Sequence, residues 1–211
     1  MTIYTLYYSP GTASMVVHLA LLEIGTAHEL RLVDFEAGEQ HDADYLKLNA
    51  GGVVPTLLID GRALTESGAL LMILAERHPA AKLAPAPGTP AHEAWTQWIV
   101  YLSNTLMSTY RLWFYPAELG SDEHDQAIRA ALQKKIEGVW DRLEAHLENH
   151  GPYLLGAEFS GADLLLAMLM RWSRNMPRPV SEWPALNRLA GLIRARPSWQ
   201  KLYEIEALSE W

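Results

Sequence analysis

The chain contains no cysteine among its 211 residues. This absence excludes structural disulfides, thiolate metal sites and any mechanism in which the protein itself supplies a sulfur nucleophile. Any thiol chemistry must therefore use a thiol that a ligand carries. The eight histidines are scattered without the spacing of a zinc site, so we expect no metal centre.

Long hydrophobic runs and basic clusters are missing as well. The longest strongly apolar run, LLLAMLM at 164–170, is too short to span a bilayer, and the start MTIYTLYYSP does not resemble a signal peptide. The formal net charge of −8 argues against a general nucleic-acid surface, because phosphate binding needs clustered lysine and arginine. We therefore expect a cytoplasmic protein that binds neither membranes nor nucleic acids.

The composition that is present, 49% hydrophobic and 20% charged, is that of a globular protein. The first 80 residues alternate between strand-like and helix-like segments in the order βαβ, a connector, then ββα. Strand patterns occupy 2–8, 28–35, 54–60 and 62–65. Helical patterns occupy 15–24 and 67–78, with stops at Gly25 and Pro79. These patterns predict an α/β domain over residues 1–80.

The composition then changes. Residues 81–90 are rich in proline and are typical of a linker. No later segment has a convincing strand pattern, and helical patterns occupy 91–115, 124–149, 161–173, 184–195 and 198–206. We therefore predict an all-helical domain over residues 91–211.

The stretch YYSPGTASMVVHLALLEIG at 7–25 predicts a strand end, a tight loop and the first turns of a helix. The start of that helix directs unsatisfied N–H groups at an anion beside Ala13, which favours a thiolate over a thiol. A hydroxyl that donates to the sulfur would lower its pKa further. Ser14 is the first candidate because it follows Ala13 at the helix start, and the hydroxyls of Ser9, Thr12 and Tyr8 are the other candidates. The alternative is that Ser14 serves as the N-cap of the helix, and both roles are compatible.

Two further segments, Val54-Pro55 and Glu66-Ser67, each allow both a structural and a functional interpretation. The Val54-Pro55 bond is either an ordinary strand start or a special turn with a cis peptide, which would free the backbone of Val54 to pair with an extended ligand. At a predicted helix start, Glu66 suits an ammonium group and Ser67 a carboxylate. Simple capping of the helix is the favoured interpretation of Ser67 on spacing alone.

In the second domain, Ser160 and Asp163 form a capping-box pattern, which predicts a buried helix rather than a catalytic pair. The helix over 95–116 is rich in aromatic residues, and its first half is typical of a core. Its second half suits either the core or an apolar substrate pocket, and the residues concerned are Met107, Tyr110, Arg111, Phe114 and Tyr115. We assign Tyr8, at the end of the first predicted strand, to the same pocket.

Taken together, these features resemble the glutathione S-transferase family over essentially the whole chain. The motifs are YYSPGTAS after a first strand, GGVVP before a hairpin, LTES opening the next helix, and GAEFSGADLLLAMLMRW in the helical domain. The pattern is most similar to the bacterial beta class.

The resemblance implies a thioredoxin-like domain that binds glutathione and a helical domain that supplies most of the site for a hydrophobic co-substrate. It implies that Val54 pairs its backbone with the cysteinyl part of glutathione, that Pro55 is cis, and that Glu66 and Ser67 hold the γ-glutamyl end. It also implies a homodimer and a role in detoxification.

The chain departs from the beta-class pattern at three places. Ala13 stands where the class has its cysteine, and Met107 and Ser108 stand where the class has a His-Lys pair. Val53 stands where a polar residue commonly precedes the Val-Pro pair. A mixed disulfide between protein and glutathione is therefore impossible.

Our main hypothesis is a glutathione transferase that adds the ligand's thiolate to a small hydrophobic electrophile. A non-catalytic glutathione-fold protein that binds ligands or a partner is one alternative. A glutathione-dependent isomerase or peroxidase is another.

Overall fold

The computed structural model describes residues 2–209 and 211 and divides into two compact units. The first, here called the sheet unit, comprises Met1–Ala84 together with Ile193–Trp211. The second, the helical unit, comprises Pro85–Leu192. The thioredoxin-like α/β plus all-α fold class expected from the sequence is confirmed by these elements.

A four-stranded mixed sheet forms the centre of the sheet unit, in the order β2-β1-β3-β4. Its strands are β1 (Tyr4–Tyr8), β2 (His28–Leu32), β3 (Thr56–Ile59) and β4 (Arg62–Thr65). Strand β1 runs parallel to β2 and antiparallel to β3, and β3 runs antiparallel to β4. Side chains of β1 alternate between the two faces: Tyr4 and Leu6 are buried on one face, and Tyr7 on the other contacts Tyr45 with ring centroids 5.7 Å apart.

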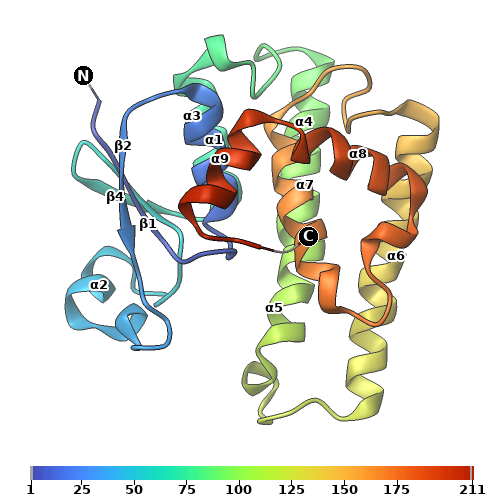
Figure 1. The fold of residues 1–211 in the computed structure, drawn as a ribbon, viewed down its shortest axis with the longest axis horizontal. Helices are drawn as coiled ribbons and strands as arrows, with labels where there is room; N and C mark the ends of the chain where they lie inside the picture. Colours follow the sequence, from blue (N-terminus) through green and yellow to red (C-terminus); the bar gives the residue numbers. More distant parts are fainter. Residues whose placement is uncertain (1, 210) are drawn as a thin grey trace. The chain divides into compact units, whose positions relative to one another are not determined.

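Helices pack around this sheet, as Figure 1 shows in blue, teal and red. They are α1 (Met15–Ile24), α2 (Ala43–Leu48), α3 (Ser67–Arg77) and α9 (Pro197–Ile205). Helix α1 lies against both α3 and α9, and its first seven residues are all buried. Gly25 ends α1 in a left-handed conformation with φ 69°, which agrees with the predicted stop at this residue.

The strand register brings three chain segments to one edge of the sheet. Tyr7 pairs with Thr56, and Thr56 pairs with Thr65. Because β3 is antiparallel to both of its neighbours, the end of β1 at Tyr8, the start of β3 after Pro55 and the end of β4 lie at the same edge. The loop before α1, which follows β1, and the start of α3, which follows β4, therefore lie close together.

The C-terminal segment belongs to the sheet unit, which differs from the predicted helical domain over 91–211. Arg196 donates from Nε and Nη2 to the Glu23 carboxylate of α1, at 2.7 Å each. Glu206 binds the loop before α1 at Gly11 and the α1 side chain of His18. Helical periodicity predicts α9 but does not reveal these partners, because they lie more than 170 positions earlier in the sequence.

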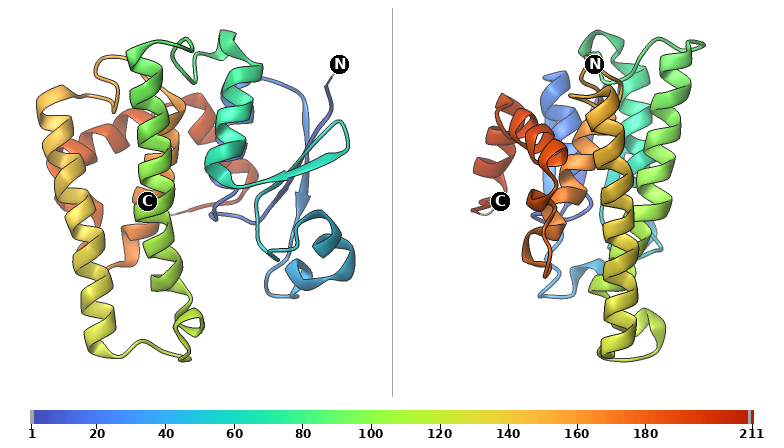
Figure 2. Two further views of the ribbon diagram at one scale, coloured as in Figure 1. Left: turned by 180° about the vertical axis from the view of Figure 1, so that it is seen from behind. Right: turned by 90° about the vertical axis from the view of Figure 1, so that its right-hand side faces the viewer.

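The helical unit contains the long helices predicted from periodicity. Figure 2 shows that α5, in green, and α6, in yellow, run side by side. They are α4 (Pro90–Tyr101), α5 (Ser108–Phe114), α6 (Gln126–His150), α7 (Gly161–Trp172) and α8 (Pro184–Arg194). A π-helical turn, Leu102–Met107, joins α4 to α5 where the sequence predicts one continuous helix. Short 3-10 helices occupy Glu39–His41, Pro79–Ala81, Pro116–Leu119, Ser173–Asn175 and Val180–Glu182.

Two helix starts in the helical unit are closed by acidic side chains. The predicted capping box is confirmed at α7, where Asp163 accepts from the N–H of Ser160 and from that of Leu154, at 2.8 Å each. At α8, the Glu144 carboxylate accepts from the N–H groups of Ala185 and Leu186 at 2.8 and 2.9 Å. Neither helix start is available to a ligand.

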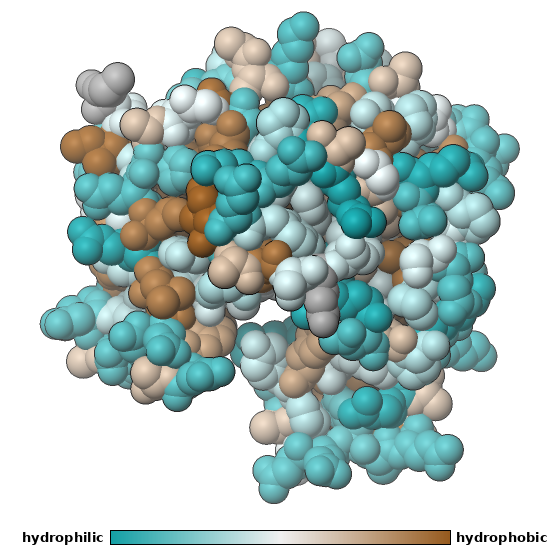
Figure 3. Space-filling model, in the orientation of Figure 1, coloured by the Kyte–Doolittle hydropathy of each residue, from teal (hydrophilic) through white to brown (hydrophobic). Residues whose placement is uncertain are grey.

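Among the described residues, no helix is long and apolar enough to cross a membrane. The face drawn in Figure 3 is mostly hydrophilic, with apolar atoms in small separate groups.

Candidate functional site

The loop before α1 is closed by hydrogen bonds among its own polar groups. The Ser14 hydroxyl donates to the carbonyl of Ser9 at 3.1 Å and accepts from the Ser9 N–H at 3.3 Å. Thr12 Oγ1 donates to the same carbonyl at 2.7 Å and lies 3.0 Å from Ser14 Oγ. Ser14 is completely buried. Its hydroxyl therefore holds the loop in shape, and the helix-cap hydrogen bond considered from the sequence is not formed.

Two donors of this loop remain open. The Ser9 hydroxyl is partly exposed and has no partner among residues 2–209 and 211. Within that same part of the chain, the N–H of Ala13 also has no partner. The first turn of α1 carries no acidic residue that would repel an anion. The Ser14 hydroxyl, the first candidate from the sequence, is thus buried and already bonded, whereas the Ser9 hydroxyl, another candidate, is open.

The starts of α1 and α3 are tied together. Ser67 Oγ donates to the carbonyl of Ala13 at 2.9 Å, so the Ser67 hydroxyl proton is already used. The N–H groups at the first turn of α3 are available to an anion, and that turn contains no acidic residue. Glu66, which precedes α3, is exposed and has φ 71°. Non-glycine residues held at positive φ are rare and cluster at binding sites.

Before β3, the Val54-Pro55 peptide is cis, as the family resemblance implies. Neither the N–H nor the C=O of Val54 has a hydrogen-bond partner within the described part of the chain. The carbonyl of Val53, in contrast, accepts from the Tyr45 hydroxyl at 2.6 Å and from Asn49 Nδ2 at 2.7 Å. These bonds fix the turn on one side and leave the backbone of Val54 free to pair with an extended ligand.

Tyr8 lies where β1 meets the loop and is half-buried. Burial raises the pKa of Tyr8, and the nearby Glu206 carboxylate raises this pKa further. Tyr8 therefore keeps its proton at neutral pH. Glu206 itself accepts from the Gly11 N–H at 2.9 Å and lies 2.8 Å from Nδ1 of the fully buried His18.

The pocket residues predicted in the helical unit fall into two groups. Tyr110 is completely buried, and its ring packs against those of Trp140 and Trp172, which corrects its assignment to an open pocket. Burial raises the pKa of Tyr110. Phe114 stacks on Tyr110 with ring centroids 5.7 Å apart, yet is 48% exposed, so it presents an apolar surface at the end of α5.

The remaining three predicted pocket residues are accessible. Met107 is half-buried at the end of the π-helical turn. The Arg111 guanidinium lies 4.2 Å above the ring centroid of Tyr115 and is paired with Glu118. Arg111 is therefore neutralised locally, and its planar face extends the aromatic surface of Tyr115.

Two features of this region escape sequence reasoning. Glu206 reaches the loop across 195 positions, and nothing in the pattern of the last helix indicates this contact. The π-helical turn at Leu102–Met107 contains no proline or glycine from which a break in the helix could be predicted. Among the described residues, no group of three acidic or histidine side chains is arranged to hold a metal ion.

The fold, a four-stranded mixed sheet with packed helices followed by a helical unit, defines a thioredoxin-like protein with an appended helical unit. Models of known families agree with this class. Residues 4–84 match the glutathione S-transferase N-terminal domain, and residues 126–199 match its C-terminal domain. The chain belongs to the glutathione S-transferase family.

Individual relatives are similar over nearly the whole chain. Glutathione S-transferase GST-4.5 from Xanthomonas campestris pv. campestris is 29% identical over 205 residues, 97% of this chain and 99% of that protein. A glutathione transferase homologue from Sulfitobacter, solved with bound glutathione, has a TM-score of 0.87 at 29% identity, covering 99% of this chain and all of that one. A bacterial beta class transferase from Sphingomonas chungbukensis has a TM-score of 0.84 at 30% identity, covering 97% and 100%.

Proposed function

We propose that this protein is a glutathione transferase that ionises the thiol of bound glutathione and adds it to a small hydrophobic electrophile. The observation that carries the proposal is the set of unpartnered backbone groups at one edge of the sheet: the Ala13 N–H, both polar groups of Val54 and the first turn of α3. Such groups match the backbone and the charged ends of a tripeptide.

In this proposal, glutathione binds as an extended strand. Val54 exchanges hydrogen bonds with the cysteinyl residue of glutathione, and the cis Pro55 directs the backbone of Val54 outward. The γ-glutamyl carboxylate binds the N–H groups of Ser67 and its successors, while Glu66 binds the ammonium group. The side chain of Val53 contributes shape alone, because it is apolar, and the Val53 carbonyl is already bonded inside the unit.

The sulfur of glutathione then lies at the start of α1. The Ala13 N–H and the helix dipole stabilise the thiolate, and the Ser9 hydroxyl donates to it. Ser14 and Thr12 act as positioning residues, because their hydroxyls hold the Ser9 carbonyl and leave the Ser9 hydroxyl free. Tyr8 stays protonated and is a second neutral donor. The thiol proton passes to solvent water, the thiolate attacks the electrophile, the new carbon–sulfur bond forms, and the leaving group departs with its electron pair.

The electrophile binds to apolar surface of the helical unit in this proposal. Met107, Phe114 and Tyr115 supply that surface, and Arg111 extends it by stacking on Tyr115. Tyr110 supports Phe114 from within the core. A pocket of this kind selects shape and hydrophobicity more than one reacting group, which suits a role in detoxification.

The proposal includes a cytoplasmic homodimer, for which the family resemblance is the support. Light scattering of the purified protein would then give twice the chain mass of 23.7 kDa. A mass of one chain would contradict this part of the proposal and leave the glutathione site untouched.

A crystal structure with glutathione tests the site directly. We expect the cysteinyl backbone to bond Val54, the γ-glutamyl carboxylate to lie at the first turn of α3, and the sulfur to lie within hydrogen-bond distance of the Ala13 N–H and Ser9 Oγ. Turnover of an aryl halide with glutathione by the same preparation tests the chemistry. A tripeptide bound elsewhere, or bound without turnover, would contradict the proposal.

A further inference from the structure

The end of α6 carries two histidines, His146 and His150, that take no part in the proposed glutathione or electrophile sites. They are four positions apart in the helix, so they are neighbours on one of its faces. Their ring centroids are 5.1 Å apart. The expectation of no metal centre rests on the scatter of the eight histidines, and this pair is an exception to that scatter.

Each of the two rings has a nitrogen that is free to bind. Nε2 of His146 lies 2.9 Å from the carbonyl oxygen of Leu154. Because a carbonyl oxygen only accepts, Nε2 donates its proton, which leaves the lone pair of the neutral ring on Nδ1. Nδ1 has no partner in the described part of the chain and is not buried. His150 is exposed, and within residues 2–209 and 211 its ring nitrogens make no hydrogen bond or ion pair.

Neighbouring groups hold the ring of His146 in place. The ring packs against that of Trp98 on α4, with centroids 4.6 Å apart, and the bond to the Leu154 carbonyl fixes its orientation. A hydrogen bond from the second ring nitrogen to a carbonyl orients metal-binding histidines in the same way. His146 is therefore a preorganised ligand, and the exposed His150 is able to adjust to it.

The separation of the two rings suits one shared metal ion. A metal–nitrogen distance of about 2.0–2.1 Å places each ring centroid about 3.2 Å from the metal, so two imidazoles at about 90–110° have centroids roughly 4.5–5.2 Å apart. The observed 5.1 Å lies within this interval. The ring separation therefore does not have to change for both histidines to bind one ion.

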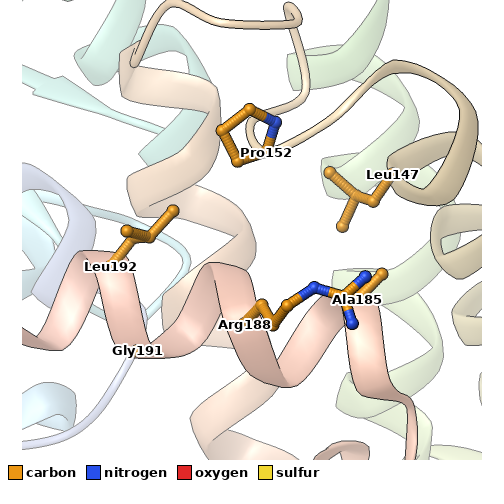
Figure 4. Close-up of a pocket in the computed structure, with 6 residues that line it drawn as sticks. All are labelled: Leu147, Pro152, Ala185, Arg188, Gly191 and Leu192. Carbon is orange, nitrogen blue, oxygen red and sulfur yellow. The ribbon is translucent and has the colours of Figure 1, made fainter.

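The surroundings of the pair favour a cation. His150 is the last residue of the 25-residue helix α6, and carbonyl oxygens at a helix C-terminus carry partial negative charge. Glu148 is exposed in the same turn and adds a negative charge. Figure 4 shows that Leu147 faces the open hollow beside α8. Because successive residues of a helix point about 100° apart, the histidine pair lies on a different face from that hollow.

We propose that His146 and His150 bind a divalent transition-metal ion, with a preference for Cu(II). Nδ1 of His146 and one ring nitrogen of His150 are the protein ligands, and water molecules complete the coordination. Imidazole nitrogens suit copper, nickel and zinc, whereas magnesium and calcium take oxygen ligands. For a given set of nitrogen ligands, the affinity is highest for Cu(II). With two protein ligands, the ion is exchangeable and is not a resident cofactor.

The experiment is titration of the tag-free protein with copper(II) chloride by calorimetry, without glutathione, whose thiol also binds copper. We expect His150→Ala to weaken the tightest copper site at least about tenfold, since the loss of even an outer-shell partner costs about 10–100-fold. His41→Ala removes another exposed histidine and Glu148→Gln a neighbouring charge, and both should bind copper like the wild type. Ni(II) and Zn(II) should bind more weakly than Cu(II), and Mg(II) should not bind.

Electron paramagnetic resonance of the copper complex identifies the ligands. We expect coupling to two nitrogens in the wild type and to one in His150→Ala. His146→Ala should lose copper affinity as well, and its thermal midpoint checks that it is folded without the bond to Leu154. His150→Ala removes no such bond, so it tests the proposal even where His146→Ala does not fold.

Several results would overturn the proposal. Absence of copper binding by the wild type would do so, as would equal affinity in the wild type and His150→Ala, because the ion would then lie elsewhere. A loss in His41→Ala or Glu148→Gln as large as that in His150→Ala, or magnesium binding as tight as copper binding, would show that the imidazole pair does not hold the ion. Turnover of glutathione with an aryl halide should be the same in the wild type and His150→Ala, so failure of the glutathione proposal is measured separately.

Discussion

Two serines stand at helix starts in this protein, and their surroundings differ. At α7, Ser160 has an extended backbone and forms a capping box with Asp163: the Ser160 side chain accepts from the Asp163 N–H, and the Asp163 carboxylate accepts from the Ser160 N–H. At α1, Ser14 already has helical backbone angles, its side chain makes no cap, and its hydroxyl bonds back to Ser9. The start of α7 is closed and structural, whereas the start of α1 keeps open donors for a ligand.

A serine before a helix therefore does not by itself identify a cap or a catalytic group. What decides is where the hydroxyl proton goes and which N–H groups stay unpaired. Acidic side chains close α7 and α8, while the first turns of α1 and α3 contain no acid.

Breaking the closed start of α7 should have the largest effect on stability. Asp163→Ala leaves the buried N–H groups of Leu154 and Ser160 without an acceptor. We expect the free energy of unfolding to fall by about 3 kcal/mol, since each unsatisfied buried donor costs roughly 1–3 kcal/mol. Urea denaturation measures this, and Asp122→Ala, at an exposed position, is the control. A loss in Asp163→Ala no larger than in the control would show that the box is not structural.

The same carboxyl should give a pH-dependent stability of unusual sign. Burial raises the pKa of Asp163 to about 6 from an ordinary 3.8. The folded state then binds the proton more tightly than the unfolded one, so this contribution is complete below about pH 4 and is lost as the pH rises through about 6. The loss amounts to about 3 kcal/mol.

To isolate this contribution, the stability of the wild type is compared with that of Asp163→Asn at a series of pH values from 4 to 7. The stability of the wild type relative to the variant should fall over this interval. A constant difference would mean that the Asp163 carboxyl titrates alike in both states.

At the open helix starts, a substitution should change ligand affinity more than stability. Ser67→Ala removes the bond to the Ala13 carbonyl that ties α3 to α1, but keeps every backbone donor. We expect glutathione affinity to fall about fivefold to tenfold, in line with one lost hydrogen bond of about 1 kcal/mol. Calorimetry of glutathione binding measures the change, and Ser121→Ala, whose hydroxyl bonds an exposed loop carbonyl, should bind like the wild type. An unaltered glutathione affinity in Ser67→Ala would show that the bond between the starts of α3 and α1 is not needed for glutathione binding.

A substitution in the middle of a helix should have the smallest effect on stability. It serves as a reference for the substitutions at the helix starts. Gly138 is exposed within α6, and a Cβ placed on it meets no atom within 4 Å. Gly138→Ala should raise the free energy of unfolding by about 0.5–1 kcal/mol, because alanine loses less backbone entropy in a helix. Glutathione affinity should not change. A decrease in urea stability would show that this position has contacts that the structure does not contain.

Much of the fold follows from local signals in the sequence. Apolar periodicity locates α1, α3 and α6 to within about two residues. Gly25 marks the end of α1, and Asp163 marks the start of α7. These signals are readable because each depends on neighbours three or four positions away. The attachment of α9 to the sheet unit was not predictable, since it depends on Glu206 and Arg196 meeting partners far away in the sequence.

The sequence indicated which segments form the candidate site but not the hydrogen bonds within them. Spacing and family resemblance indicated Val54, Pro55 and Ser67, and the structure adds that the backbone of Val54 is unpaired. Sequence reasoning ranked Ser14 above Ser9, because it could not show that the Ser14 hydroxyl is buried and bonded to Ser9. Hydrogen-bond partners of short polar side chains depend on loop geometry, which residue types alone do not determine.

The central claim is that an open start of α1, assisted by the Ser9 hydroxyl, ionises the thiol of bound glutathione. Ultraviolet absorbance of the thiolate, followed against pH in the complex, measures the pKa of that thiol. We expect this pKa to be lower in the wild-type complex than in free glutathione, to rise by about one unit in Ser9→Ala, and to rise less in folded Ser14→Ala, whose hydroxyl acts only by positioning Ser9. An unchanged pKa in Ser9→Ala, or an equal rise in Ser14→Ala, would contradict the account.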